Sequence, residues 1–246
     1  IIIKPKDGVT ITFTGSSTVP FKTSSYITLE GFIFNCAGSQ TLVKLEGCNN
    51  MRITRNVFEL AQTSSAKWIL IGGVYDDLVY PYNNPSHHNR IDHNTFQNKT
   101  LPGHYITIDG NNKVDQSQYD RIDHNYFKNN DPRATNEQES VRIGWSDMSK
   151  SSGFTTVEFN LFENCNGDPE IVSVKSSDNI VRHNTFRSSY GTLSLRHGNR
   201  NRLEGNYFFG EGKPIGNAPA PNEATLLYTG GIRIYGKDHV IINNYF

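Results

Sequence analysis

The sequence predicts an all-β protein: a right-handed, single-stranded parallel β-helix in which short strands stack coil upon coil. Two observations support this fold class. An Asn-x-Phe signature follows a short apolar run seven times, and successive copies lie 38, 31, 35, 24, 22 and 38 residues apart. Within each unit, apolar and polar residues alternate with the period of a strand. A unit of about 22–25 residues cannot bury its apolar face alone, so the units must stack on one another.

The asparagines of this signature are expected to be structural. Asn tolerates the left-handed conformation of tight turns, and an inward-facing Asn can hydrogen bond to the equivalent Asn of the next coil. The longer intervals hold polar or Gly/Pro-rich insertions, such as 75–88 and 211–222. The seven copies of the signature begin at Asn56, Asn94, Asn125, Asn160, Asn184, Asn206 and Asn244.

The chain has 246 residues and a formal net charge of zero, which suits one elongated β-helix domain over 1–246. It opens on a strand-like run and closes inside a signature, so we expect a fragment of a longer chain that lacks terminal caps. Neither a nucleic-acid-binding motif nor a membrane-spanning run is present, and the sequence does not predict the oligomeric state.

Three cysteines, Cys36, Cys48 and Cys165, show no metal-ligand spacing. We expect buried thiols, and a Cys36–Cys48 bridge stays open as the alternative for a secreted protein.

Four units carry a basic residue in the strand that precedes the next signature. When the units are aligned by this strand, one position holds Arg142, Lys175, Arg196 and Arg233. Adjacent coils lie about 4.8 Å apart, so the alignment predicts a ladder of positive charges on one face. Folding does not need such a ladder, whereas an extended polyanion lying across the coils would account for it. For any single residue, an arginine stem that covers apolar surface remains the alternative.

Acidic residues lie next to these cations in the sequence. Asp168 and Glu170 are two residues apart, so in a strand they would face the same side. The preceding coil contributes Asn136 and the following acids. Carboxylate and amide oxygens suit a hard cation such as Ca²⁺, and the lack of His and Cys there disfavours Zn²⁺. The alternative is that the two acids simply neutralise Lys175 and Arg142.

A calcium ion, a lysine and an arginine facing an anionic polymer are what β-elimination of a uronate requires. Ca²⁺ on the uronate carboxylate neutralises it and stabilises the enolate-like transition state. Lys175 would remove the C5 proton as the base. Arg196, 21 residues later and so about one coil away, would stabilise the developing charge and assist departure of the 4-oxygen. His197 is expected to bind sugar or relay a proton, and a purely structural histidine is the alternative.

These residues resemble polysaccharide lyase family 6, which contains alginate lyases and chondroitinase B. The resemblance covers roughly 120–246. It rests on Asn136-x-x-Glu139-Ser140-x-Arg142, on Gly167-Asp168-Pro169-Glu170 continuing to Lys175-Ser176, and on Leu195-Arg196-His197-Gly198.

The resemblance implies a parallel β-helix and Ca²⁺-assisted β-elimination, with alginate as the substrate we choose. It makes Lys175 the base and Arg196 the acid or leaving-group partner. It also implies a secreted or periplasmic protein. The calcium ligands would be Asn136, Asp168 and Glu170, and the substrate contacts Glu139, Arg142, His197 and Arg233.

Several other functions stay open at this stage. A related lyase could act on dermatan sulfate or pectate, and sulfate would require further basic residues such as Arg182, Arg187, Arg200 and Arg202. A glycoside hydrolase would need paired acids, for which Asp76-Asp77 and Asp168 with Glu170 are the candidates. A non-catalytic polysaccharide-binding solenoid is the third alternative.

Overall fold

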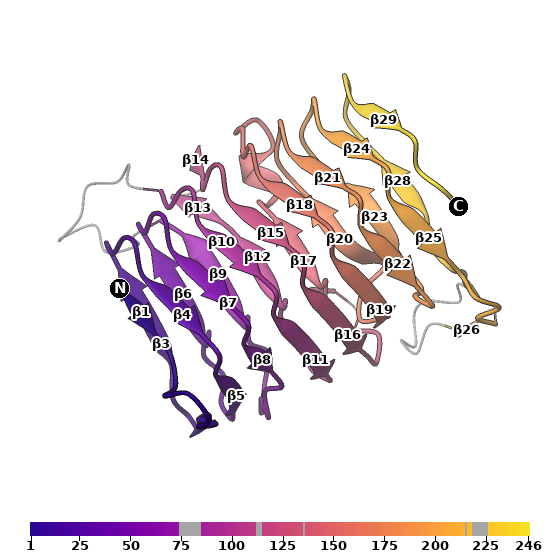
Figure 1. The fold of residues 1–246 in the computed structure, drawn as a ribbon. Coiled ribbons are helices and arrows are strands. Elements are labelled where there is room, and N and C mark those ends of the chain that lie inside the picture. Colours follow the sequence, from indigo (N-terminus) through magenta and orange to yellow (C-terminus); the bar gives the residue numbers. More distant parts are fainter. Residues whose placement is uncertain (74–84, 112–114, 135, 215, 218–225) are drawn as a thin grey trace.

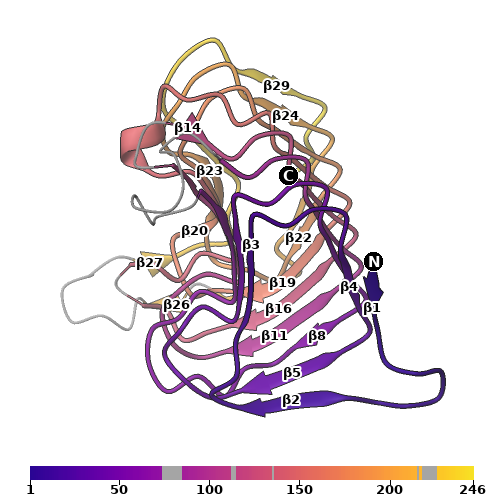
Figure 2. The same ribbon diagram turned by 90° about the vertical axis from the view of Figure 1, so that its left-hand side faces the viewer.

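The computed structural model describes residues 1–73, 85–111, 115–134, 136–214, 216–217 and 226–246. The chain winds into a stack of coils, and successive coils add parallel strands to three sheets, here called sheets A, B and C. The two ends of the chain lie at opposite ends of the stack (Figure 1). Seen from the side in Figure 2, the three sheets enclose a common interior. The predicted all-β parallel β-helix is confirmed.

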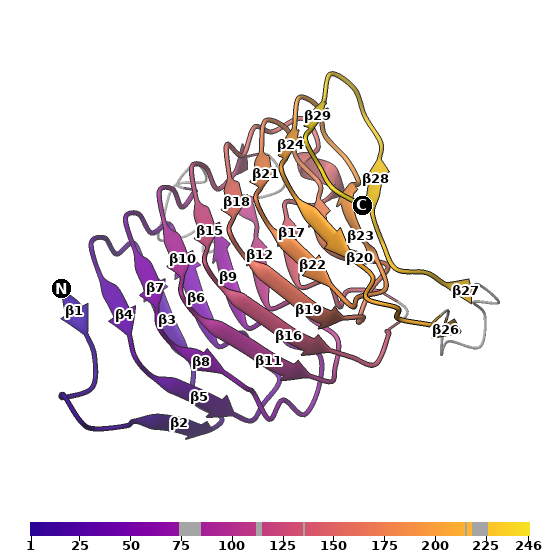
Figure 3. The same ribbon diagram turned by 45° about the vertical axis from the view of Figure 1, so that its right-hand side comes forward.

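Each sheet takes its strands in chain order, as Figure 3 shows for sheets A and B. Sheet A consists of β1 (Ile2–Ile3), β4 (Thr28–Glu30), β7 (Arg52–Thr54), β10 (Arg90–Asp92), β15 (Arg121–Asp123), β18 (Thr156–Glu158), β21 (Ile180–Arg182), β24 (Arg202–Glu204) and β29 (Val240–Ile242). Sheet B consists of β2 (Thr12–Gly15), β5 (Ile33–Cys36), β8 (Val57–Phe58), β11 (Thr95–Lys99), β16 (Tyr126–Asn130), β19 (Leu161–Cys165), β22 (Thr185–Arg187) and β25 (Tyr207–Phe209). Sheet C consists of β3 (Val19–Lys22), β6 (Val43–Glu46), β9 (Ile69–Gly72), β12 (Ile106–Ile108), β17 (Val141–Ile143), β20 (Glu170–Val174), β23 (Thr192–Leu195) and β28 (Ile232–Ile234).

Small elements project from the stack. Two antiparallel pairs join β13 (Gly110–Asn111) to β14 (Asp115–Gln116) and β26 (Gly216–Asn217) to β27 (Leu226–Leu227). A single 3₁₀ turn, η1 (Ser146–Met148), follows β17. None of the described residues forms a helix long and apolar enough to cross a membrane.

The signature asparagines form a continuous ladder of hydrogen bonds at the turn between sheets A and B. Asn160 is representative: its Oδ1 accepts from the backbone N–H of Asn125 at 2.9 Å and from the side-chain amide of Asn125 at 3.0 Å. Its own Nδ2 donates to Asn184 Oδ1 at 3.0 Å. The expected structural role of these residues is therefore confirmed. The same contacts run through Asn56, Asn94, Asn125, Asn160, Asn184, Asn206 and Asn244.

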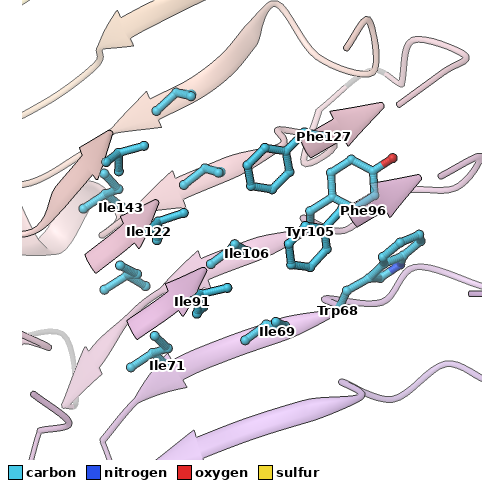
Figure 4. Close-up of a cluster of buried hydrophobic side chains, with 14 of the residues drawn as sticks. Trp68, Ile69, Ile71, Ile91, Phe96, Tyr105, Ile106, Ile122, Phe127 and Ile143 are labelled. Atoms are coloured by element: carbon cyan, nitrogen blue, oxygen red, sulfur yellow. The ribbon is translucent and has the colours of Figure 1, made fainter. Parts of the chain in front are cut away.

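The phenylalanines of the signature form a second ladder inside the coil. Consecutive rings stack with centroids 4.7–5.0 Å apart, a separation at which offset stacking adds to the gain from burial. Columns of Ile and Val from sheets A and C fill the rest of the interior. Tyr105 packs against Phe96, and Trp68 packs against Tyr105 (Figure 4). The stacked rings are those of the signature residues Phe58, Phe96, Phe127, Phe162, Phe186, Phe208 and Phe246, and Phe34 of an earlier coil extends the stack.

The three cysteines are buried, free thiols. The expectation of buried thiols is confirmed, and the alternative of a Cys36–Cys48 bridge is wrong. Burial raises the pKa of the Cys165 thiol to about 12, so it is held in its neutral form.

Lys99, at the end of β11, is a fully buried cation. Its Nζ donates to Gln62 Oε1 at 2.6 Å and to the carbonyl oxygens of Ala66 at 3.3 Å and Pro102 at 3.4 Å. It also lies 5.1 Å from the centroid of the Trp68 ring. Burial nevertheless lowers the pKa of Lys99 to about 7, because the charged form loses hydration that these contacts replace only in part.

Replacing one member of the asparagine ladder should destabilise the whole stack. Asn160→Ala removes contacts to two neighbouring coils and leaves buried backbone groups unpaired. We expect the free energy of unfolding to fall by about 2–4 kcal/mol, measured by chemical denaturation. Asn35→Ala, at an exposed position in β5, should cost less than about 0.5 kcal/mol. Equal losses in the two variants would contradict a special role for the ladder.

The buried Lys99 should make stability depend on pH. The folded chain releases this proton near pH 7, whereas the unfolded chain keeps it up to the ordinary value of 10.5. The unfolded state therefore binds more protons between these values, and stability contributed by this site rises with pH across that window. Lys99→Met should therefore have a higher free energy of unfolding than the wild type at pH 7. This difference should be smaller at pH 9.5, as measured by denaturant titration. Lys150→Met, at an exposed position, serves as the control.

Candidate active site

Lys175 and Arg196 occupy equivalent positions in adjacent coils on the outer face of sheet C. Val174 of β20 pairs with Leu195 of β23, and the two cations are the next residues along each strand. The Lys175 N–H donates to the Ile143 carbonyl at 2.7 Å, and the Arg196 N–H donates to the Val174 carbonyl at 2.8 Å. The backbones of Gly144 and Tyr235 make the same contact in the coils on either side. Four successive coils therefore place Gly144, Lys175, Arg196 and Tyr235 in one row along the stack.

The other two basic residues belong to a different row, so the predicted ladder of four is wrong. Arg142 pairs with Ser173, and Ser194 pairs with Arg233. Both arginines thus lie two residues earlier along their strands than Lys175 and Arg196. The sequence alignment slipped by two residues, a shift that leaves the inside–outside alternation unchanged and is therefore invisible in the pattern.

Glu170 gathers the cations of the last two coils. Its carboxylate forms an ion pair with Arg233 and accepts a hydrogen bond from the Ser173 hydroxyl, and Arg196 Nε lies 3.4 Å away. Arg233 also donates to Ser194 Oγ at 2.8 Å. The alternative that the two acids neutralise Lys175 and Arg142 is not what is seen for Glu170, which neutralises Arg196 and Arg233 instead.

The ring of Tyr235 lies against both arginines. Its centroid is 5.3 Å from the Arg196 guanidinium and 5.7 Å from that of Arg233. These contacts limit the positions that the two guanidinium groups can take.

Asp168 is a buried carboxylate just before β20. Its oxygens accept from the backbone N–H of Glu170 at 3.0 Å and from that of Gln138 at 3.4 Å. Burial, followed by the negative charge of Glu139, raises the pKa of Asp168 to about 7. A cation beside Asp168 would therefore be stabilised, and its oxygens are the donors that Ca²⁺ prefers.

The three predicted calcium ligands are not brought together as a finished metal cage. Asn136 lies exposed in the segment before β17, and Glu170 already binds two arginines. Within the described residues, no group of three or more His, Cys, Asp or Glu side chains is arranged to hold a metal ion. The donor chemistry suits calcium, but Glu170 would have to share its oxygens between the metal and the arginines.

Lys175 rests against a buried acid. Its Nζ lies 3.2 Å from Glu139 Oε1, and Glu139 Oε2 lies 2.9 Å from Nε2 of His104. Burial alone would raise the pKa of Glu139, but the contact with His104 and the charges of His104 and Lys175 outweigh it and hold that pKa below its usual range. Sequence reasoning placed Glu139 at the substrate. It missed His104. This residue lies two positions before β12, just as Glu139 lies two positions before β17, so the two occupy equivalent positions in adjacent coils.

His197 follows Arg196 and faces the same surface. Its Nε2 lies 3.2 Å from Ser146 Oγ of η1. Burial, and then the charges of Arg196 and Lys175, lower its pKa, so the imidazole is neutral at neutral pH. Arg142 is almost buried and lies 3.9 Å from Asp109, at the edge of this group. The acid pair Asp76-Asp77, considered for glycoside hydrolysis, lies outside the described residues.

Comparison with known proteins gives a family match over the whole chain. The family model for chondroitinase B matches residues 1–246. A search of curated proteins gives no match. Among solved structures, the chain is similar to a mannuronic acid specific polysaccharide family 6 lyase from human gut microbiota, with a TM-score of 0.71 and 27% identity over 100% of this chain and 55% of that one.

Two further solved structures show the same similarity. The alginate lyase AlyGC of the PL6 family has a TM-score of 0.66 and 28% identity over 99% of this chain and 35% of its own. The PL6 polysaccharide lyase Pedsa3628 from Pseudopedobacter saltans, at 24% identity and a TM-score of 0.66, supports the fold alone. The chain spans between about a third and about a half of the length of these relatives.

Neutralising Glu170 should loosen the group of cations around it. Glu170→Gln leaves Arg196 and Arg233 without their shared counter-charge, and both arginines are more than a third exposed, so solvent screening limits the loss. We expect the free energy of unfolding to fall by about 1–2 kcal/mol, measured by denaturant titration. Glu211→Gln, which removes an exposed partner of Arg187, should have no measurable effect. A neutral result for Glu170→Gln would contradict the shared counter-charge.

Proposed function

Because the chain belongs to the chondroitinase B family, we propose that it is a polysaccharide lyase that cleaves alginate by β-elimination. The observation that carries this proposal is the shared position of Lys175 and Arg196 in adjacent coils on the outer face of sheet C. Coils are about 4.8 Å apart, which is close to the length of one sugar ring. One residue can thus act at C5 of a uronate while the other acts at the oxygen on C4.

The proposed reaction divides between these two residues. Lys175 Nζ takes the C5 proton, the electrons of the C5–H bond form the C4–C5 double bond, and the C4–O bond breaks. The departing oxygen then takes a proton from water, and Arg196 in the adjacent coil stabilises its developing negative charge. Arg233 and the neutral His197 lie beside this pair and are the groups that would bind the sugar. The residues of the site therefore supply a base, a leaving-group partner and substrate contacts on one surface.

The uronate carboxylate must be neutralised for its C5 proton to become acidic. Calcium, when bound by Asp168 with Glu170 and Asn136, would supply that neutralisation. Of the chain's own residues, Arg196 and Arg233 contribute fixed positive charge at the same surface, and Tyr235 holds their guanidinium groups in place.

The placement of the remaining basic residues favours an unsulfated polymer. The four arginines considered for sulfate recognition lie in sheets A and B or in a turn beside sheet A, away from Lys175. Each is already paired with an acid: Arg182 with Glu158, Arg187 with Glu211, Arg200 with Asp178 and Arg202 with Glu204. Alginate carries carboxylates and no sulfate, so it fits this distribution better than dermatan sulfate. An extracellular polymer of this kind also implies a secreted or periplasmic enzyme.

Lyase activity is tested by the ultraviolet absorbance of the unsaturated product on alginate, dermatan sulfate and polygalacturonate. We expect a rise on alginate, and a loss of at least about 1000-fold in kcat for Lys175→Ala, because the base is removed. Lys150→Ala, at an exposed position in the loop after η1, is the matched control and should keep full activity. A rise on another polymer would reassign the substrate. Binding to alginate without any absorbance change would favour a non-catalytic polysaccharide-binding solenoid.

Calcium binding is tested without reference to activity. Calcium should raise the thermal midpoint of the wild type, because a ligand that binds only the folded state stabilises it, and calorimetric titration should give a dissociation constant. Asp168→Asn should weaken this binding by about tenfold or more, since it removes the carboxylate that most needs a cation. Asp178→Asn, which alters an acid in the turn before sheet A, should leave it unchanged. Equal binding by both variants would exclude Asp168 as a ligand.

A further inference from the structure

A chain of polar contacts reaches from a covered part of the outer face of sheet C to the amine of Lys175. Thr107 Oγ1 lies 2.7 Å from His104 Nδ1, and His104 Nε2 lies 2.9 Å from Glu139 Oε2. The other oxygen of that carboxylate, Oε1, accepts a hydrogen bond from Lys175 Nζ at 3.2 Å. The contacts cross three successive coils, those of β12, β17 and β20. Each step joins groups of complementary hydrogen-bonding character.

The inner members of this chain of contacts are buried. His104 and Thr107 have no exposed surface, and Glu139 has 1% of its surface exposed. The N–H direction of His104 is not well aligned with Glu139, so the 2.9 Å contact is a close polar contact rather than an ideal hydrogen bond. Among the described residues neither His104 Nε2 nor Glu139 Oε2 has another hydrogen-bonding partner. Since buried polar atoms are costly without partners, each of these atoms depends on the other.

Glu139 is therefore poorly placed to contact a polymer. Its oxygens face His104 on one side and Lys175 on the other, and its carboxylate is covered. Lys175 keeps 17% of its side chain exposed, so it is the outermost member of the chain and the one a polymer can reach.

We propose that His104 and Glu139 are positioning residues for Lys175: His104 orients the Glu139 carboxylate, which holds the Lys175 amine at the surface and stabilises the ammonium that forms when Lys175 takes a proton. This inference rests on the proposed lyase function. No bond to the substrate is made by either residue. In the reaction, the proton moves from C5 to Lys175 Nζ, and the new positive charge lies beside a carboxylate that is already oriented and dehydrated. His104 prevents that carboxylate from turning away.

The test compares kcat and KM of lyase variants on the polymer that the wild type cleaves. Glu139→Gln should lower kcat by about 10- to 100-fold while KM changes by less than about twofold, because the transition state loses its counter-charge and substrate binding does not. His104→Ala should lower kcat by about tenfold. His104→Gln should recover part of that loss, because its amide can still donate to Glu139. In the double variant, the His104 change should add little to the loss from Glu139→Gln.

The matched control is His124→Asn. His124 Nδ1 also lies 2.8 Å from a buried carboxylate, that of Asp123, but on sheet A, and it adopts a left-handed conformation that Asn tolerates. Its kcat should equal that of the wild type. Thermal unfolding of every variant excludes a loss of folded protein as the cause. The proposal is overturned if Glu139→Gln keeps its kcat, if the loss lies in KM alone, or if the two changes are additive.

A readout that needs no activity separates this proposal from the proposed function. Acetic anhydride labels free amines, and mass spectrometry measures the rate at each lysine. Glu139→Gln and His104→Ala should each raise the labelling rate of Lys175 at neutral pH severalfold, because the amine is no longer held 3.2 Å from a fixed carboxylate oxygen and becomes more accessible to the reagent. Exposed Lys150 serves as the reference within each sample and should not change. Unchanged labelling of Lys175 would overturn the positioning role even in an active enzyme. Increased labelling in a protein without lyase activity would support the contact while the proposed function fails.

Discussion

The ladder of buried asparagine side chains fixes the register on which the rest of the molecule depends. Successive rungs are 22 to 38 residues apart in sequence, so no constant repeat length keeps the strands aligned. Instead, each asparagine side chain hydrogen bonds to the equivalent asparagine of the coil before and of the coil after, as Asn160 does with Asn125 and Asn184. Extra residues leave the coil at turns and return without shifting the next strand. The phenylalanine stack, two residues further along each coil, adds apolar burial to the same alignment.

This strand register determines which side chains lie together at the candidate site. Side chains alternate along a strand, so a slip of one residue would turn Lys175 into the core. With the observed pairing, Lys175 and Arg196 project from neighbouring coils on the same face. Two carboxylates then balance four basic groups in pairs: Glu139 lies between His104 and Lys175, and Glu170 binds Arg196 and Arg233. These contacts hold the basic side chains in place, so the anionic polymer proposed as the substrate would bind them without a large cost of reorganisation.

The sequence predicted those features that repeat and missed those that depend on alignment between repeats. The Asn-x-Phe signature was enough to predict the fold and its ladder, and the spacing of 21 residues was enough to pair Lys175 with Arg196. The row of Arg142 and Arg233 was misplaced, because a shift of two residues preserves the alternation of strand residues. His104 was not found, since it precedes the Glu139 coil by 35 residues and only the observed strand pairing brings them together. The burial of Glu139 likewise follows from packing that no local pattern records.

The interior and the active surface meet at Gly144, which holds the position before Lys175 in the same row. Its φ of +75° is a left-handed conformation that favours glycine, and a Cβ there would come within 2.6 Å of the buried Gln116 Oε1. A side chain at this position would therefore strain the backbone and displace the side chain of Gln116, which β14 places over the row. On the other side the row continues from Arg196 to Tyr235. A polymer lying along this row would meet open backbone at Gly144, then the proposed base, then the proposed leaving-group partner and finally an aromatic ring, so the two ends of the row differ.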